Sequence, residues 1–479
     1  MRRAFLGIDC GTQSTKVVLV DAKSLQPKVI GQAPHQLIER DDGTREQEPT
    51  EWIGALIAAA RAIPRDVEVA GIGVSGQQHG LVCLDADGDP VRPAKLWNDT
   101  TTAAECVALT ERLGGPGRVL ALTGNTFLPG YTAPKVEWLR THEPERYART
   151  KRMCLPHDYL NLWLTGEYVT EPGDASGTAY FDVRSREYSG AVLGAIDDVR
   201  DWHATLPPVG RSLSVIGGLR EKAAEALGLR AGIPVSAGGG DNMCAAIGIG
   251  LTAEGAVGVS LGTSGTAFAY RAAPALDPKG EASAFCDSTA GWLPLVATLN
   301  CGGVVNWVLA LFGVGTGDLR TALRSSPPGA NGLAFLPYLD GERTPNLPNG
   351  TGSFAGVRSS HRRDDFIRAA VEGVTFGLHY AFGALRRAGV HDEAICLVGG
   401  GSQSDEWAQL VADVIGLPVR RGIAEAAGTG AALQARWVID GEEPIVTTDG
   451  GWQPRPDPAL EEARERVARL RDLAIGGAL

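Results

Sequence analysis

Asp241 stands where a fixed carboxylate could do chemistry. It follows three glycines in the stretch GGGDN, residues 238–242, between the apolar run IPVSA and the stretch MCAAIGIG. A helix N-cap is the plainer explanation, because aspartate is among the preferred N-cap residues. The two roles are compatible, since a capping carboxylate is held rigidly and the bare glycines leave room for a substrate hydroxyl. A helix N-terminus stabilises negative charge, so we expect a lowered pKa for Asp241, which phosphoryl transfer tolerates because the acceptor hydroxyl loses its proton late.

Asp9 precedes a Gly-Thr turn that occurs twice in the chain. The stretch GIDCGTQST begins at Gly7, and GVSLGTSGT, beginning at Gly258, repeats its order of glycine, apolar residue, polar residue, any residue, glycine and threonine. Successive backbone N–H groups in such turns bind phosphate oxygens. Asp9 would then suit a divalent cation such as Mg²⁺, and Lys16 would add a positive charge for the same phosphates. One such turn alone is commonly structural, so it is the pair that favours a polyphosphate site.

Several enzyme classes are excluded because the sequence lacks residues that are essential to their motifs. An aspartic protease needs a second aspartate in the repeated motif, where this chain has Ser260. The sequence contains no GxxxxGK[ST] loop and no HRD or DFG set of a protein kinase. Its eight cysteines form no CxxC pair, which gives no indication of a zinc site or a redox dithiol. A nucleotide would therefore have to bind to a different fold.

Further glycine and polar clusters follow predicted strands. In VGGGSQSDEW, residues 398–407, Gly400 and Gly401 lie between a strand and a helix, where a nucleotide could approach the backbone closely. A bare strand-to-helix turn explains the glycines equally well. The stretches SGQQHG (75–80) and LWND (96–99) supply amide, imidazole, indole and carboxylate groups of the kind that bind a polyol. These side chains are Gln78, His79, Trp97, Asn98 and Asp99.

The elements that would position these residues alternate between strands and helices. We expect a hairpin over residues 4–21, a strand-turn-strand unit over 67–85, and a strand over 394–400. Helical spacing occurs at 50–63, 103–114, 364–389, 404–416 and, amphipathically, 459–477. Together with the repeated Gly-Thr motif, this order predicts an α/β fold of two related halves, residues 1–247 and 248–479.

Composition and charge limit the classes of binding partner that the chain could have. The 479 residues are 44% hydrophobic and carry a formal net charge of −11, with acidic and basic residues interspersed. The chain lacks the basic stripe of a nucleic-acid-binding protein and lacks an apolar run long enough for a membrane span or a signal-peptide core. We therefore expect a cytoplasmic protein that binds neither nucleic acid nor membrane.

Taken together, the motifs resemble those of the FGGY carbohydrate kinases. The motifs occur in the family's order from Gly7 to about residue 440: GIDCGTQSTK, GQQHG, LWND, GYTAPK, GGGDN, LGTSG, FLPYLDGERTP and VGGGSQSDEW. The resemblance implies two ribonuclease-H-like domains, related to actin, that enclose a catalytic cleft for MgATP and a sugar. It is strongest to the members that phosphorylate D-xylulose at O5, and we leave a homodimer open.

The resemblance also implies roles for individual residues. The general base falls on Asp241 and the metal-associated aspartate on Asp9. The sugar would lie near Gln78, His79, Asp241 and Asn242, with Trp97 and Asp99 from LWND. Phosphate and nucleotide contacts fall on Thr12, Ser14, Lys16, Gly262, Thr263, Ser264, Gly302, Asn306, Gly400, Gly401 and Asp405.

Two positions depart from the pattern of the D-xylulose-specific members. Gln78 stands where we expect methionine, and His157 stands in PHDY where PKDY is expected. An amide adds a donor and an acceptor beside the sugar, which could change the preference among ketoses. Two alternatives therefore remain: a kinase for another ketose or polyol, such as ribulose, and a non-catalytic actin-like protein that binds ATP or a sugar.

Overall fold

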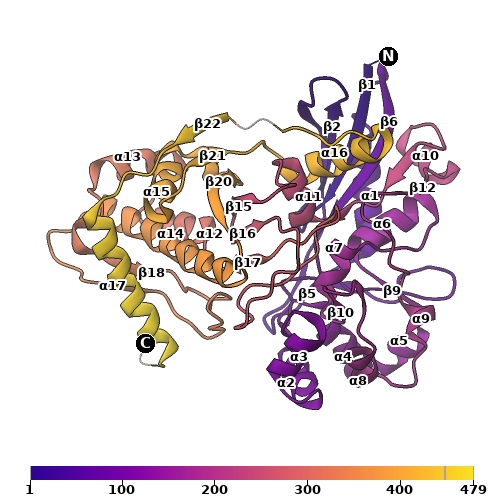
Figure 1. Cartoon of the computed structure of the whole chain (residues 1–479), viewed down its shortest axis with the longest axis horizontal. Helices are drawn as coiled ribbons and strands as arrows, with labels where there is room; N and C mark the ends of the chain where they lie inside the picture. The colour runs from indigo at the N-terminus through magenta and orange to yellow at the C-terminus, as the bar shows by residue number, and fades with distance from the viewer. Residues whose placement is uncertain (1, 447–448, 478–479) are drawn as a thin grey trace.

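The chain forms two lobes, each built around its own sheet (Figure 1). The computed structural model describes residues 2–446 and 449–477. The first sheet has the strand order β12-β13-β6-β1-β2-β3, with β14 also paired to β6, and the second has the order β17-β16-β15-β20-β21-β22. The strands of the first sheet are β1 (Arg2–Cys10), β2 (Ser14–Asp21), β3 (Pro27–Pro34), β6 (Val67–Gly76), β12 (Val215–Gly218), β13 (Pro234–Ser236) and β14 (Gly239–Gly240). Those of the second are β15 (Gly255–Leu261), β16 (Gly265–Ala269), β17 (Leu295–Thr298), β20 (Asp392–Val398), β21 (Val419–Arg421) and β22 (Asp449–Trp452).

The two sheets repeat the same core topology. In the first, β1, β2 and β3 pair antiparallel in sequence order, and β6 lies parallel to β1 on its other side. In the second, β15, β16 and β17 form the antiparallel set and β20 lies parallel to β15. The internal repeat of the sequence therefore corresponds to a structural repeat, and the predicted α/β class with two related halves is confirmed.

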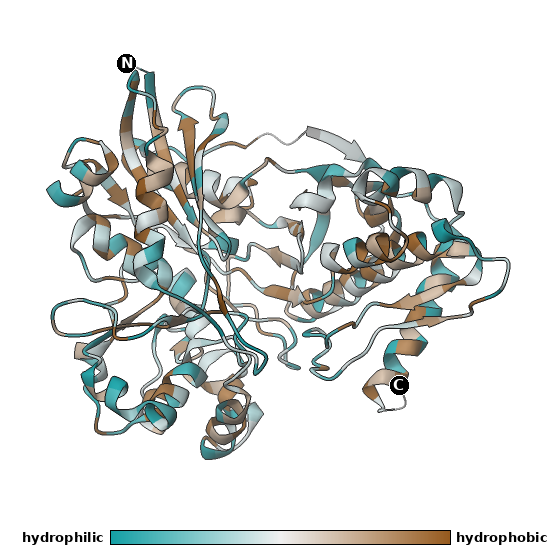
Figure 2. Ribbon diagram, turned by 180° about the vertical axis from the view of Figure 1, so that it is seen from behind, coloured by the Kyte–Doolittle hydropathy of each residue, from teal (hydrophilic) through white to brown (hydrophobic). Residues whose placement is uncertain are grey.

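Helices cover both sheets and form the outer part of the first lobe. Apolar residues run along the central strands of the first lobe, whereas polar residues gather on its outer helices and loops (Figure 2). The helices of the first half are α1 (Pro49–Ala60), α2 (Ala103–Arg112), α3 (Pro116–Thr123), α4 (Thr132–His142), α5 (Pro144–Arg149), α6 (Pro156–Thr165), α7 (Pro172–Ala175), α8 (Gly190–Ile196), α9 (Trp202–Thr205), α10 (Glu221–Leu227) and α11 (Asp241–Gly248). Those of the second half are α12 (Gly302–Leu311), α13 (Leu319–Ser325), α14 (Arg363–Arg387), α15 (Asp405–Ile415), α16 (Ala426–Asp440) and α17 (Pro458–Ile475).

Most of the predicted elements are present, and one strand pairing differs. The hairpin β1–β2 and the helices α1, α2, α14, α15 and α17 lie where the sequence places them. Gly416, with a positive φ of 79°, ends α15 as expected for a C-terminal glycine. Both strands of the predicted strand-turn-strand unit over 67–85 are present, as β6 and β7 (Val82–Leu84), but β7 pairs with β9 (Arg152–Cys154) and not with β6. A strand partner from a distant segment leaves no local signal in the sequence.

Helix α16 joins the two halves. Although it follows β21 in sequence, it packs against β1, β2 and β6 of the first sheet and against α11. Glycines permit this close approach. A Cβ on Gly430 would lie 1.7 Å from the carbonyl oxygen of Cys244, and a Cβ on Gly7 would lie 1.8 Å from the carbonyl oxygen of Gly428. The division at residue 248 therefore separates the strands of the two sheets, while α16 and its N-terminal end belong spatially to the first.

Within residues 2–446 and 449–477, no single helix is long and apolar enough to cross a membrane. A pair of helices bent by 95°, Gly302–Leu311 with Thr316–Ser325, reaches that length and composition only when both helices are counted together.

Candidate active site

A cleft of about 460 Å³ lies between the ends of the two central hairpins and receives residues from both lobes. The first lobe contributes Asp9, Lys16, Asp241 and Asn242, and the second contributes residues at the ends of β15 and β20. Asp9 and Ser260, which occupy corresponding positions of the repeated motif, both line it. The two carboxylates that the sequence singles out are thus brought together. The remaining lining residues are Ala245, Phe268, Val398, Gly399, Gly400, Ser402, Gln403 and 422–427.

Asp241 is the first residue of α11, and its pKa is raised. The N-cap is Gly240, so the predicted capping role of Asp241 is wrong. Burial, and then the negative charge of Asp9, raise the pKa of Asp241 to about 7, although hydrogen bonds from Asn242 act in the opposite direction. The expected lowering by the helix N-terminus is therefore also wrong, because loss of hydration and a like charge outweigh it. A carboxylate with a pKa of about 7 has the acidity that a general base needs near neutral pH.

Asn242 fixes one oxygen of the Asp241 carboxylate. Its backbone N–H and its Nδ2 donate to Asp241 Oδ1 at 2.7 and 2.8 Å. Asn242 Nδ2 also donates to Gln78 Oε1 at 3.2 Å, and its Oδ1 accepts from Thr266 Oγ1 at 3.3 Å. Within the described chain, Asp241 Oδ2 has no protein donor. One oxygen is therefore held and the other is available to a substrate hydroxyl.

The glycines before Asp241 are needed for close packing. A Cβ on Gly238 would lie 2.1 Å from the Val74 carbonyl oxygen, and one on Gly239 would lie 2.0 Å from Ser288 Oγ. A Cβ on Gly240 would lie 2.7 Å from Gln78 Cγ. These neighbours already fill the space beside the loop. The glycines therefore let the loop lie against β6 and its neighbours, while Asp241 at its end lines the cleft.

Asp9 sits at the end of β1, with one carboxylate oxygen bonded. Ser75 Oγ donates to Asp9 Oδ1 at 3.0 Å, and Oδ2 has no donor in the described part of the chain. Burial raises the pKa of Asp9 to about 6 against the opposing effects of Ser75 and Lys16, and Glu425 raises it further. Lys16 Nζ forms an ion pair with Glu425 Oε2 at 2.6 Å, so its charge is shared with an acidic residue that sequence reasoning did not find.

The two Gly-Thr turns have different surroundings. In the first, the Thr12 hydroxyl accepts from Trp97 Nε1 at 2.9 Å and donates to Gln77 Oε1 at 3.2 Å, and Ser14 Oγ accepts from Gln32. Trp97 is thereby attached to the first turn. The second turn, with Gly262, Thr263 and Ser264, lies against the start of α12: Gly302 and Gly303 donate their N–H groups to the carbonyls of Gly262 and Thr263.

The predicted nucleotide residues of the second lobe lie at different depths. Gly400 is exposed and has open space around its α-carbon, whereas a Cβ on Gly401 would lie 2.8 Å from Leu261 and Trp407. Asn306 is exposed on α12. Asp405 is half-exposed and pairs with Arg421 at 2.7 Å. Gly400 is the one of these residues that lines the cleft itself.

Gln78 and His79 present buried polar atoms without partners. Gln78 Nε2 and His79 Nδ1 are buried and have no hydrogen-bond partner in the described chain. Both approach Gly177, whose Cβ would lie 2.3 Å from His79 Nδ1 and 3.5 Å from Gln78 Nε2. Burial, with the charges of Arg343 and Lys135, lowers the pKa of His79 well below its usual value, so its imidazole is neutral. Buried polar groups are normally hydrogen-bonded, so both atoms are free to bond a polar ligand or a water molecule.

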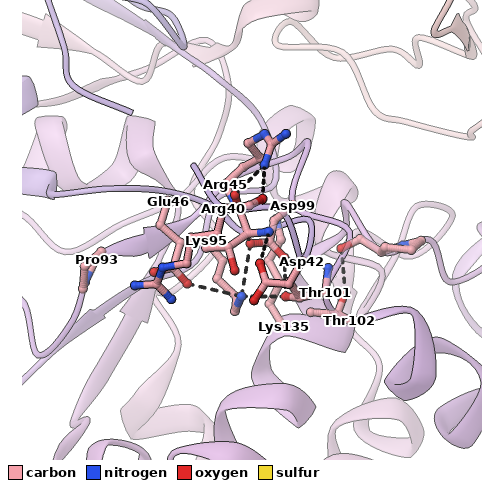
Figure 3. Close-up of polar contacts among 12 residues, drawn as sticks. Arg40, Asp42, Arg45, Glu46, Pro93, Lys95, Asp99, Thr101, Thr102 and Lys135 are labelled. Carbon is pink, nitrogen blue, oxygen red and sulfur yellow. Dashed lines mark hydrogen bonds and ion pairs between the residues drawn. The ribbon is translucent and has the colours of Figure 1, made fainter. Parts of the chain in front are cut away.

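Asp99 does not belong to this group. Its side chain is fully buried, and Lys95 Nζ, the Arg45 N–H and the Thr101 N–H and hydroxyl donate to its two oxygens (Figure 3). Lys95 Nζ also lies 3.2 Å from Glu46. The expected sugar contact of Asp99 is therefore wrong, because its carboxylate is already satisfied inside a buried ionic network.

Comparison with known proteins decides the family. Models of the FGGY family of carbohydrate kinases match the chain over residues 4–248 (N-terminal domain) and 257–438 (C-terminal domain). The chain belongs to the FGGY family. The xylulose kinase of Haemophilus influenzae is 42% identical to it over 446 residues, 90% of each chain, and that of Streptomyces rubiginosus is 38% identical over 474 residues, 98% of this chain and 95% of the relative. The crystal structure of a xyloylose kinase from Brucella ovis superposes with a TM-score of 0.91 at 31% identity over 99% of both chains.

The family assignment makes this protein a carbohydrate kinase and confirms the resemblance seen in the motifs. As an FGGY kinase it uses ATP. Sequence reasoning missed the part of this FGGY kinase's cleft formed by residues 422–427, including Glu425. The segment carries no distinctive motif, and the one available signal was its run of small residues before the glycines of α16.

The activity of this FGGY kinase should depend on pH through Asp241. The pKa of Asp241 is raised to about 7, and a base is active when it is ionised. We expect kcat/KM for the sugar to be level above about pH 7 and to fall about tenfold per pH unit well below it. The measurement is initial-rate ADP release between pH 5 and 9 at fixed ionic strength. A profile that stays flat to pH 5 would contradict Asp241 as a base of this pKa.

Proposed function

We propose that this FGGY kinase transfers the γ-phosphoryl group of ATP to O5 of D-xylulose, giving xylulose 5-phosphate and ADP. The observation that carries the proposal is the presence of Asp9 and Asp241, from two different motifs, in one cleft between the lobes. The substrate assignment is supported by relatives named xylulose kinase at 38–42% identity over most of the chain.

Asp241 is the proposed general base. Asn242 holds Oδ1, so Oδ2 accepts the hydrogen bond of the sugar hydroxyl and takes its proton as the new O–P bond forms. In a loose phosphoryl-transfer transition state, orientation of the hydroxyl contributes more than early deprotonation. The bonds from Asn242 to Gln78 and from Thr266 to Asn242 resist rotation of this carboxylate.

Asp9 is the proposed residue for Mg²⁺. Carboxylate oxygens are the ligands that Mg²⁺ prefers, and Asp9 Oδ2 has no donor in the described residues, so the side chain fits this ion directly or through water. The ion, when bound, neutralises charge on the phosphates. Release of the Lys16 ammonium from Glu425 would let it contact the same phosphates, while Gly400 leaves the backbone near β20 open to the nucleotide.

Gln78 and His79 are proposed to bind the sugar. Gln78 Nε2 can donate to a sugar hydroxyl while its Oε1 accepts from Asn242, so Gln78 would link the sugar to the base. His79 Nδ1 can bond a second hydroxyl from the neutral imidazole. An amide at position 78 thus has a use at both ends, which makes it compatible with D-xylulose.

A substrate panel tests the proposal. ADP release is measured with MgATP and D-xylulose, D-ribulose, L-ribulose, L-xylulose, L-fuculose, gluconate or glycerol. We expect kcat/KM for D-xylulose to exceed that of every other sugar by at least about tenfold, a difference of about 1.4 kcal/mol. Preference for another sugar would keep the mechanism and overturn the substrate. No turnover with any of them would overturn the enzymatic proposal.

A further inference from the structure

His157 lies behind the loop that carries Asp241. It is the second residue of α6 and is 1% exposed. Its Nε2 lies 2.5 Å from the carbonyl oxygen of Ala237, which begins the loop of residues 237–240. A carbonyl only accepts, so Nε2 carries the proton in this bond. Asn161 Nδ2 lies 2.9 Å from Nε2 and donates to the same carbonyl at 2.9 Å, so His157 and Asn161 hold it together. The ring is also packed against the loop, because a Cβ on Gly238 would lie 2.9 Å from Nε2.

The other ring nitrogen faces two carboxylates. His157 Nδ1 is 3.2 Å from Asp158 Oδ1 and 3.5 Å from Asp174 Oδ2, and all three side chains are buried. With Nε2 protonated, a neutral ring would direct the lone pair of Nδ1 at two negative oxygens. A proton on Nδ1 converts this repulsion into an ion pair on both sides. The buried carboxylates likewise need a cation, since neither oxygen of Asp174 has a hydrogen-bond partner among the described residues.

All the titratable groups around the ring favour its charged form. Asp158 lies on the same helix, while Asp174 and Glu171 come from the segment that includes α7. Burial lowers the pKa of His157, but the nearby carboxylates of Asp158 and Asp174 outweigh it, so the pKa is raised well above its usual value. Burial raises the pKa of Glu171 to about 7 while the charge of His157 lowers it. Among these neighbours, within the described residues, no second cation is available to neutralise the aspartates.

The loop is held from its other side by a neutral residue. Gln434 of α16 accepts from the N–H of Gly238 at 2.7 Å and donates to its carbonyl at 2.9 Å. Gly239 and Gly240 then pair with Ser75 and Gly76 of β6. Each residue of the loop 237–240 is therefore bonded to a buried partner. Among these partners, His157 is the one that carries a charge.

We propose that His157 is a positioning residue for the catalytic loop, acting as an imidazolium that is anchored between Asp158 and Asp174 and that fixes the carbonyl of Ala237. This proposal rests on the proposed role of Asp241 as the base. A shift of about 1 Å in a reacting group can lower a rate by about 100-fold, so an unanchored loop should lower kcat without changing nucleotide binding.

Two variants separate charge from shape. His157→Gln keeps a donor for Ala237 but removes the charge, and His157→Lys keeps a positive charge in the same place. We expect His157→Gln to lower kcat by about 10- to 100-fold while KM for ATP changes less than about twofold, and His157→Lys to recover most of the loss. His379→Gln, in α14 of the other lobe, is the matched control and should retain the kcat of the unmodified enzyme.

Further measurements distinguish a loss of positioning from a loss of the fold. In the unmodified enzyme, ¹⁵N chemical shifts of His157 should report both ring nitrogens protonated at neutral pH, where an ordinary histidine has lost its second proton. A neutral ring, a folded His157→Gln variant with full kcat, or failure of His157→Lys to recover activity would each overturn the proposal. So would a stoichiometric metal ion in the purified enzyme that is lost with His157, because the cation would then be the metal. Failure of the proposed function is distinguishable, since Asp241→Asn would then stay active whatever the result at His157.

Discussion

Asp241→Asn should reduce sugar phosphorylation by about 1,000-fold or more while leaving nucleotide binding intact. The amide keeps the size of the side chain, and its oxygen can still accept the bonds from Asn242. It cannot take the proton of the sugar hydroxyl, and general-base catalysis typically contributes about 10²- to 10⁴-fold. Removal of one of two neighbouring negative charges in the cleft should not weaken MgATP binding.

The measurement is steady-state ADP release with D-xylulose, together with calorimetric titration of MgATP. Asp182→Asn, at a half-buried aspartate of β10 (Phe181–Asp182) outside the cleft lining, is the matched control and should keep its rate. A variant that retains more than about one-tenth of kcat would remove Asp241 from the role of base. Loss of nucleotide binding together with activity would indicate that Asp241 mainly supports the fold.

Sequence reasoning identified the two carboxylates but not the environment that sets their chemistry. The motif around Asp241 indicated a strand followed by a helix, and the structure has both. The raised pKa depends on burial and on Asp9, which is far away in the chain. A local argument from the helix N-terminus therefore had the wrong sign. The contribution of a distant charge becomes visible only once the lobes are assembled.

The fold was predictable because each copy of the repeat has a recognisable local sequence pattern. Each copy of the Gly-Thr motif lies in a hairpin whose strands are buried on both faces, as in β1 and β2. The return of α16 to the first sheet was not predictable in this way. Gly428 and Gly430 have low helix propensity, so from the sequence they argue against a stable helix. Their role in close packing is visible only once their neighbours, β1 and α11, are known.

Side-chain type alone gave a wrong prediction where a buried polar group already has its hydrogen-bond partners within the protein. Asp99 and Trp97 occur in one short stretch and have equal claims as sugar contacts from the sequence. Trp97 donates to Thr12 in the first Gly-Thr turn, whereas Asp99 is enclosed by Lys95, Arg45 and Thr101. A carboxylate with two satisfied oxygens has little left to offer a ligand. Only the hydrogen-bond partners distinguish the two cases.

Asp9→Asn should lower kcat by about 100-fold at ordinary Mg²⁺ concentrations and should make the rate depend on Mg²⁺ up to much higher concentrations. An amide is a weaker ligand than a carboxylate for a hard cation, whether it binds directly or through water. The side chain keeps its size, and its oxygen can still accept from Ser75. A loss that reflects misfolding would not be recovered by added Mg²⁺, so partial recovery between about 1 and 50 mM identifies the metal role.

The same variant should also move the pH profile. The negative charge of Asp9 helps to raise the pKa of Asp241, so its removal should shift the acid limb of kcat/KM to lower pH. The sign follows because a neutral neighbour no longer opposes ionisation of Asp241, and the base stays active in more acidic solution. The measurement is the rate between pH 5 and 9 at the highest Mg²⁺ concentration used. An unchanged Mg²⁺ dependence with an unchanged acid limb would show that the two carboxylates act independently, and the shared cleft would then need another explanation.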